Sequence, residues 1–115
     1  MGKMKENPRK PLRENKKITV GRVEDLPVGR SATVELPKNG ELALFNVKGK
    51  FYAIENFCPH KGVPLAESQV QGKIVECERH GWKFDLQTGE CFEKEGCSIE
   101  AYEVIVEDDE IKIIV

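Results

Sequence analysis

Long apolar segments are absent from this chain of 115 residues. No stretch approaches the roughly 18 consecutive apolar residues that a membrane-spanning helix needs, and the first residues lack the apolar core of a secretory signal. Apolar residues also fail to recur at the 3.6-residue period of an amphipathic helix, so we expect little regular helix. The sequence therefore predicts a soluble, cytoplasmic protein that does not associate with a membrane.

Cysteine and histidine are scarce, with 4 Cys and 2 His in the chain. This cysteine content is far below the roughly 8 to 10% that marks a disulfide scaffold. A chain of this length forms a single domain, and its core is large enough to fold without disulfide staples. The cysteines therefore need an explanation other than a disulfide framework.

The formal net charge of -2 conceals two oppositely charged parts. Residues 1–17 contain seven basic and two acidic residues, a net +5, whereas residues 18–115 contain 11 basic and 18 acidic residues, a net -7. The first part has few apolar residues to offset its ordering entropy, which predicts a flexible basic tail before one folded domain. This tail is either a solvated leader or a docking arm for an acidic partner. It lacks interleaved aromatic residues, so we expect no nucleic-acid partner.

Short alternating or apolar runs, rich in β-branched and aromatic residues, occupy the rest of the chain. Asn39-Gly40 and the Lys48-Gly49-Lys50 step suit tight hairpin turns, because Asn and Gly tolerate positive φ. The pattern predicts an all-β antiparallel sandwich or small barrel. The expected strands are Lys17–Arg22, Ser31–Leu36, Glu41–Val47, Lys50–Glu55, Lys73–Glu76, Val104–Glu107 and Glu110–Val115.

Both histidines follow a cysteine closely, as Cys58-Pro59-His60 and as Cys77-Glu78-Arg79-His80. At this cysteine frequency the double coincidence is about a one-in-200 accident, so the four residues predict a metal site. Cysteine and histidine in equal number suit either a tetrahedral zinc or an iron-sulfur cluster. A zinc finger usually takes like ligands from one turn, whereas here each arm supplies one of each, which lets two loops clasp a binuclear centre.

The two arms and their surroundings resemble the cluster loops of Rieske 2Fe-2S proteins. This resemblance implies that Cys58 and Cys77 bind one iron and that His60 and His80 bind the other, with one 2Fe-2S cluster per chain. It also implies a Rieske-type antiparallel β sandwich or barrel with a cluster-binding subdomain of two loops. The resemblance rests on the two arms together with Gly62, Gly81-Trp82-Lys83-Phe84-Asp85, Thr88-Gly89 and the stretch from Tyr102 to Val115.

Histidine ligation sets the redox range. Two ferric ions, two sulfides and two thiolates have no net charge, so an added electron meets less repulsion than in a cluster held by four thiolates. The expected potential lies in the window of about -150 to +300 mV. High-potential Rieske proteins carry an extra disulfide and hydroxyl donors near the cluster, whereas the matching positions here are Val63, Arg79, Trp82 and Phe84. We therefore expect a potential at the low end of this window.

The resemblance implies an electron-transfer protein and not an enzyme. The chain would pass single electrons from a flavin-dependent reductase to a terminal oxidoreductase such as a ring-hydroxylating oxygenase. A close alternative is the small subunit of an NAD(P)H nitrite reductase, and a third is a zinc-stabilised binding module without redox function. The chain departs from the usual ferredoxin pattern in one place, because residues 93–98 replace a Gly-Pro-rich third loop.

Cys91 and Cys97 are not needed for the cluster. We expect them to be unmodified, small apolar core residues. A disulfide between them is a less favoured alternative, because a reducing cytosol works against it, and a second metal or redox function is the least favoured.

Overall fold

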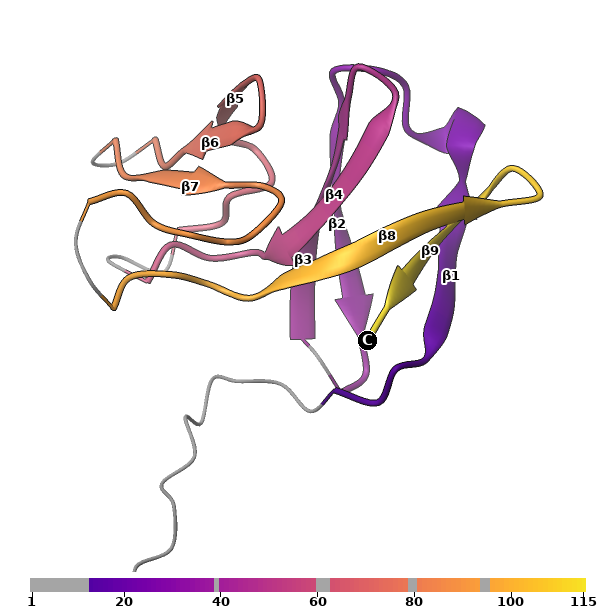
Figure 1. The fold of residues 1–115 in the computed structure, drawn as a ribbon. Coiled ribbons are helices and arrows are strands. Elements are labelled where there is room, and N and C mark those ends of the chain that lie inside the picture. The colour runs from indigo at the N-terminus through magenta and orange to yellow at the C-terminus, as the bar shows by residue number, and fades with distance from the viewer. Residues whose placement is uncertain (1–12, 39, 60–62, 79–80, 94–95) are drawn as a thin grey trace, which may run out of the picture.

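The computed structural model describes residues 13–115 except 39, 60–62, 79–80 and 94–95. Almost all of the regular structure is β (Figure 1), which confirms the predicted fold class. No helix in the described ranges is long and apolar enough to cross a membrane. In chain order the elements are β1 (Lys17–Arg22), the 3-10 helix η1 (Val23–Asp25), β2 (Ser31–Leu36), β3 (Gly40–Val47), β4 (Lys50–Glu55), β5 (Gln69–Gln71), β6 (Ile74–Glu76), β7 (Lys83–Asp85), β8 (Ala101–Glu107) and β9 (Glu110–Ile114).

The strands form two antiparallel sheets that lie side by side (Figure 1). The larger sheet has the order β1-β9-β8-β4-β3-β2, and the smaller has the order β5-β6-β7. Three predicted strands, β1, β2 and β4, have the expected bounds at both ends. The predictions missed β5 and β7, because each has only three residues and shows no alternating run that could stand out from a loop.

Two-residue turns fix the register of two hairpins in the larger sheet. Lys48 and Gly49 have φ values of 54° and 94°, and they join the closing pair Val47↔Lys50. Asp108 and Asp109, with φ values of 53° and 63°, do the same between β8 and β9. Positive φ at both central residues is the signature of a type I′ turn, whose twist matches that of the flanking strands.

The core has two parts on opposite faces of β3. Alternate residues of this strand enter each part: Leu42 and Leu44 pack with the C-terminal strands, whereas Ala43 and Phe45 pack toward the smaller sheet. All four side chains are buried. The strand therefore contributes to both parts of the core and connects the smaller sheet to the larger one.

The first described residues lie against the end of the chain. The backbone N–H groups of Glu14 and Asn15 donate to the carbonyl of Val115, at 2.7 and 3.0 Å. The Arg13 guanidinium lies 4.0 Å from the centre of the Tyr102 ring. Most of the expected tail, residues 1–12, lies outside the described residues, so the boundary after residue 17 stays a prediction.

Candidate metal centre

Two of the four predicted ligands, Cys58 and Cys77, lie within the described ranges. Cys58 follows the end of β4, and Cys77 comes directly after β6. Both side chains are fully buried in the core that the two sheets share, and neither belongs to a disulfide. The other two predicted ligands, His60 and His80, lie outside the described residues, so their assignment stays a prediction.

The two cysteine loops close in the same way. The N–H of Cys58 donates to the carbonyl of Val63 at 2.8 Å, and the N–H of Cys77 donates to the carbonyl of Trp82 at 2.7 Å. In each case the acceptor lies five residues beyond the cysteine. Each cysteine therefore begins a loop that a backbone hydrogen bond closes five residues later.

A buried asparagine joins the two ends of the first loop. The Asn56 side-chain oxygen accepts hydrogen bonds from the N–H groups of Leu65 and Ala66, both at 2.8 Å. Its amide nitrogen donates to a carboxylate oxygen of Glu41 at 3.2 Å and to the hydroxyl of Thr33 at 3.3 Å. The loop is therefore fixed to β2 and β3 through one side chain two residues before Cys58, a role that the sequence analysis missed.

A glycine turn returns the second loop to the sheet. The N–H of Gly81 donates to the carbonyl of Cys77 at 2.8 Å, and Gly81 has a φ of +72°, a conformation that side chains disfavour. The chain then re-enters the sheet at β7, where Lys83 lies opposite Glu76 of β6. Antiparallel pairing of β6 with β7 thus holds both ends of this loop.

The described donors fit the thiolate half of a Rieske cluster. No group of three or more metal-binding side chains gathers within the described ranges, as expected where only the two cysteines of the predicted set are described. Buried thiols that are not oxidised to a disulfide are suitable ligands for a soft, iron-sulfur type of centre. Val63 and Trp82 pack, partly buried, against the same core.

Acidic side chains border the second loop. Glu67, Glu76 and Glu78 line a shallow groove of about 350 Å³ together with Cys77 and Gly81. All three carboxylates are exposed. Negative charge beside a cluster opposes the uptake of an electron, although water and salt screen it. The groove is therefore consistent with the expected low potential.

The remaining cysteines form a disulfide, so the expectation that Cys91 and Cys97 are unmodified was wrong. Their Cα atoms are 5.4 Å apart, within the normal range for a disulfide. Cys91 forms a β-bridge with Phe84, and the N–H of Phe92 donates to the carbonyl of Lys83 at 3.1 Å. The disulfide therefore links the segment that pairs with β7 to Cys97. The usual ferredoxin pattern has its Gly-Pro-rich loop in this part of the chain.

Comparisons with known proteins agree with this site. Residues 16–103 match the Rieske [2Fe-2S] domain. The chain is 35% identical over 68 residues to the ferredoxin component of the naphthalene 1,2-dioxygenase/salicylate 5-hydroxylase systems of Ralstonia sp., which covers 58% of this chain and 64% of that relative. The match thus spans less than two thirds of this curated relative.

Two solved structures have the same fold. A chain of the complex of reduced oxygenase and oxidized ferredoxin in carbazole 1,9a-dioxygenase superposes with a TM-score of 0.76 at 27% identity, covering 88% of this chain and 94% of that one. A putative small subunit of NADPH nitrite reductase gives 0.75 at 22% identity, covering 87% and 99%. Since the match to the domain family extends over most of the sequence, the chain belongs to the Rieske [2Fe-2S] domain family and binds one 2Fe-2S cluster.

Proposed function

We propose that this chain is a Rieske ferredoxin that carries single electrons from a flavin-dependent reductase to a terminal oxygenase, and that it catalyses no bond making itself. The observation that carries the proposal is the pair of buried cysteines in two identically closed loops. The similarity to the ferredoxin component from Ralstonia sp. supports this reading. We also propose a cytoplasmic location, residues 18–115 as the Rieske domain and residues 1–17 as a flexible basic tail; the family match over residues 16–103 supports the domain.

In this proposal Cys58 and Cys77 hold one iron, and His60 and His80 hold the other. When bound, the cluster supplies reversible one-electron chemistry at a moderate potential. The chain's own part is to fix the ligands and exclude water. The buried side chains around the two cysteines keep solvent from the sulfur ligands, and the closure of each loop fixes the backbone that carries them.

The nitrite reductase alternative is not better supported. Solved structures of putative nitrite reductase small subunits are 22% and 25% identical to this chain. The oxygenase-system relative is more similar in sequence, at 35% identity over 68 residues. An oxygenase system is therefore the preferred destination for the electron, and both alternatives share the same cluster.

Spectroscopy tests the cluster, and rapid mixing tests the carrier role. The purified protein should be red-brown and, after reduction with dithionite, should give the low-average-g resonance of a Rieske centre. A flavin-dependent reductase with NADH should reduce it in seconds, and a ring-hydroxylating oxygenase should reoxidise it. A colourless protein that holds one zinc would overturn the proposal.

Matched variants locate the ligands in the same assay. Replacement of Cys58 or Cys77 by Ser should abolish the resonance. The double replacement Cys91→Ala with Cys97→Ala should keep it, because the disulfide lies outside the ligand set. Loss of the resonance in the disulfide variant alone would show that the ligands are assigned to the wrong cysteines.

A further inference from the structure

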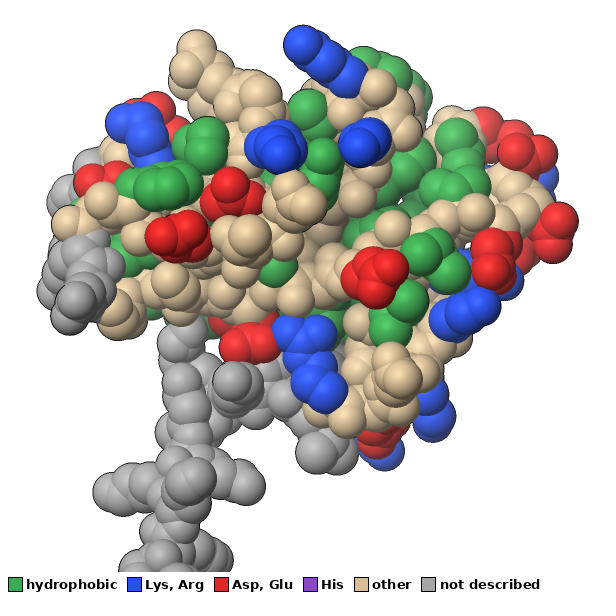
Figure 2. Space-filling view, in the orientation of Figure 1, with side chains coloured by type: hydrophobic (Ala, Val, Ile, Leu, Met, Phe, Trp, Pro, Cys, Tyr) green, Lys and Arg blue, Asp and Glu red, His purple; other side chains and the backbone are tan. Residues whose placement is uncertain are grey.

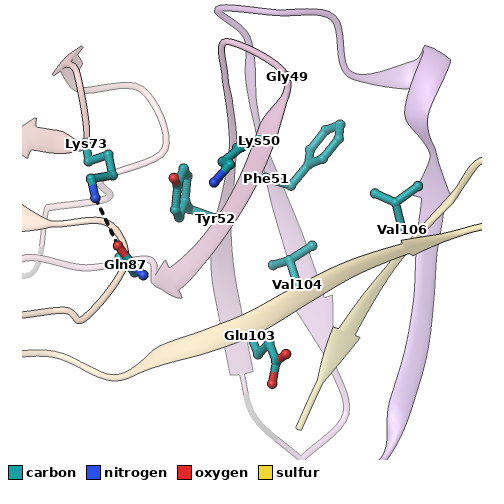
Figure 3. Close-up of a pocket in the computed structure, with 9 residues that line it drawn as sticks. All are labelled: Gly49, Lys50, Phe51, Tyr52, Lys73, Gln87, Glu103, Val104 and Val106. Carbon is teal, nitrogen blue, oxygen red and sulfur yellow. Dashed lines mark hydrogen bonds between the residues drawn. The ribbon is translucent and has the colours of Figure 1, made fainter.

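Two neighbouring strands of the larger sheet diverge and leave part of each edge open. β4 and β8 pair only at Ala53↔Tyr102 and Ile54↔Ala101. On their other sides both strands are paired, β4 with β3 from Lys50 onward and β8 with β9 from Glu103 onward. Figure 3 shows β4 and β8 separating beyond the short ladder.

The register identifies the backbone groups that face the opening. The N–H of Glu55 donates to the carbonyl of Glu100 at 2.9 Å, so both residues turn their peptide groups toward the opposite strand. Every second residue of an antiparallel strand shares this orientation. Phe51 on β4 and Val104 and Val106 on β8 therefore direct their N–H and C=O groups into the opening. Phe51 and Val104 would form the next hydrogen-bonded pair if the ladder continued.

A groove of about 790 Å³ occupies this opening. Its floor is apolar, with Phe51 and Val104 half-buried and Val106 46% exposed. Among the described residues, none that lines the groove belongs to either cysteine loop. The lining residues are Gly49, Lys50, Phe51, Tyr52, Lys73, Gln87, Glu103, Val104 and Val106 (Figure 3).

Positive charge borders one end of the groove. Lys50 and Lys73 lie on either side of the Tyr52 ring (Figure 3), and the ammonium group of Lys73 donates to the side-chain oxygen of Gln87 at 3.0 Å. The carboxylate of Glu103 points away from this end (Figure 3). Basic side chains also gather over the upper part of this face in the space-filling view (Figure 2). This is a positive site on a domain whose residues 18–115 have a net charge of -7.

We propose that this groove binds an extended, acidic segment of a partner protein. The segment adds as a strand along the open edge of β8, where the peptide groups of Val104 and Val106 are available to pair with it. Its apolar side chains cover Phe51 and Val106, and an acidic side chain enters between Lys50 and Lys73. Main-chain pairing supplies affinity in this mode of recognition, and side-chain sites supply specificity.

The positive charge of the groove favours an acidic partner segment over the chain's own residues 1–17 as its occupant. Residues 1–17 have a net charge of +5, so Lys50 and Lys73 would repel them. The described residues that line this groove lie outside both cysteine loops, so binding here is distinct from docking at those loops. The inference therefore goes beyond the electron-carrier proposal and does not depend on it.

A synthetic peptide tests the site on the intact holoprotein. The probe is a fluorescently labelled heptapeptide that alternates Glu with Val, with acetylated and amidated ends, followed by fluorescence anisotropy. We expect saturable binding and slower hydrogen exchange at Val104 and Val106. A peptide with Lys in place of Glu should bind at least ten-fold more weakly. An acidic peptide that is N-methylated at alternate residues should lose as much affinity, because it cannot pair as a strand.

Charge-reversal variants give the matched control. Lys50→Glu combined with Lys73→Glu should weaken binding of the acidic peptide at least ten-fold. Lys16→Glu combined with Lys38→Glu makes the same change of net charge away from the groove and should leave binding within two-fold. The visible spectrum of the cluster should be unchanged in every variant, which separates this test from that of electron transfer.

Each of the remaining outcomes would overturn the proposal. The first is the absence of saturable binding by the acidic peptide. The second is binding of the Lys peptide or of the N-methylated peptide with the same affinity as the acidic peptide. The third is an equal loss of affinity in the groove pair and in the control pair of variants. A dimer in sedimentation experiments that dissociates only in the Lys50 and Lys73 variant would place a second copy of the chain in the groove instead.

Discussion

The side-chain oxygen of Asn56 accepts a hydrogen bond from the backbone N–H of Leu65 at 2.8 Å, and this contact joins the two ends of the loop that contains Cys58. Ala66 donates to the same oxygen at the same distance. Asn56, Leu65 and Ala66 are all buried, so removing this acceptor leaves two buried N–H groups without their protein partner.

Asn56→Ala should therefore destabilise the fold and loosen the first loop. Two buried N–H groups lose their partner, and each such group costs about 1–3 kcal/mol. We expect the free energy of unfolding in urea to fall by about 2–4 kcal/mol and the cluster to be lost to an iron chelator several-fold faster. Asn46→Ala is the control, because this buried amide bonds to Leu26 and Gly49 away from the loop. Equal rates of cluster loss in the two variants would contradict a role for Asn56 in holding the loop.

Removal of the Cys91–Cys97 disulfide should weaken the segment beside β7. A cross-link between residues six apart restricts the unfolded chain by about 2 kcal/mol in the loop-entropy treatment. The double variant Cys91→Ala with Cys97→Ala should lose about that much in urea unfolding. The natural protein should match it after reduction with a phosphine. If the phosphine left the free energy of unfolding of the natural protein unchanged while the variant still lost about 2 kcal/mol, that result would assign the effect to packing and not to the cross-link.

Several strands could be predicted from the sequence, whereas the side-chain contacts that close its loops could not, and the ligand role of Cys58 and Cys77 stays a prediction. The bounds of β1, β2 and β4 follow from local alternation and turn residues. The disulfide depends on how the chain turns back after Phe84, which local patterns do not reveal. The same holds for Asn56, whose partners lie nine and ten residues further along the chain.

Stability should depend on pH through Glu107. Hydrogen bonds from Lys17 and then from Lys112, at 3.1 and 3.2 Å, hold the pKa of this carboxyl below its usual value. A pKa that is lower in the folded state adds stability above the unfolded pKa, and this stability is lost as the pH falls through the folded pKa. Glu107→Gln should therefore lower the melting temperature slightly at pH 7.

The difference in melting temperature between this variant and the natural protein should shrink as the pH falls below the usual carboxyl range, and also in 1 M salt. Glu103→Gln on the same strand makes the same charge change and serves as the control. A difference that stays constant with both pH and salt would show that the ion pairs of Glu107 do not contribute.

Arg13 should anchor the segment that precedes β1 to the folded domain. Its guanidinium packs on the Tyr102 ring at 4.0 Å and pairs with the carboxylate of Glu100 at 2.5 Å. Because the group is partly exposed, the two contacts together are worth about 1 kcal/mol. Arg13→Ala should reduce the free energy of unfolding by about that amount, measured in urea, whereas Lys16→Ala should change it much less. Equal effects would mean that the ring contact adds nothing.

His80→Cys tests the ligand assignment that the described residues leave as a prediction. A third thiolate adds a negative charge to the cluster, and four-thiolate clusters lie near -400 mV whereas His-ligated ones lie at about -150 to +300 mV. If His80 binds iron, the variant should keep its iron and its potential should fall by the order of 100 mV or more in an EPR-monitored redox titration. Glu78→Gln, which removes one exposed carboxylate beside Cys77, should shift the potential only slightly and upward, since solvent screens that charge. A variant whose potential and resonance match those of the natural protein would exclude His80 as a ligand, and the second histidine would then have to be sought outside the Cys-x-x-His arm.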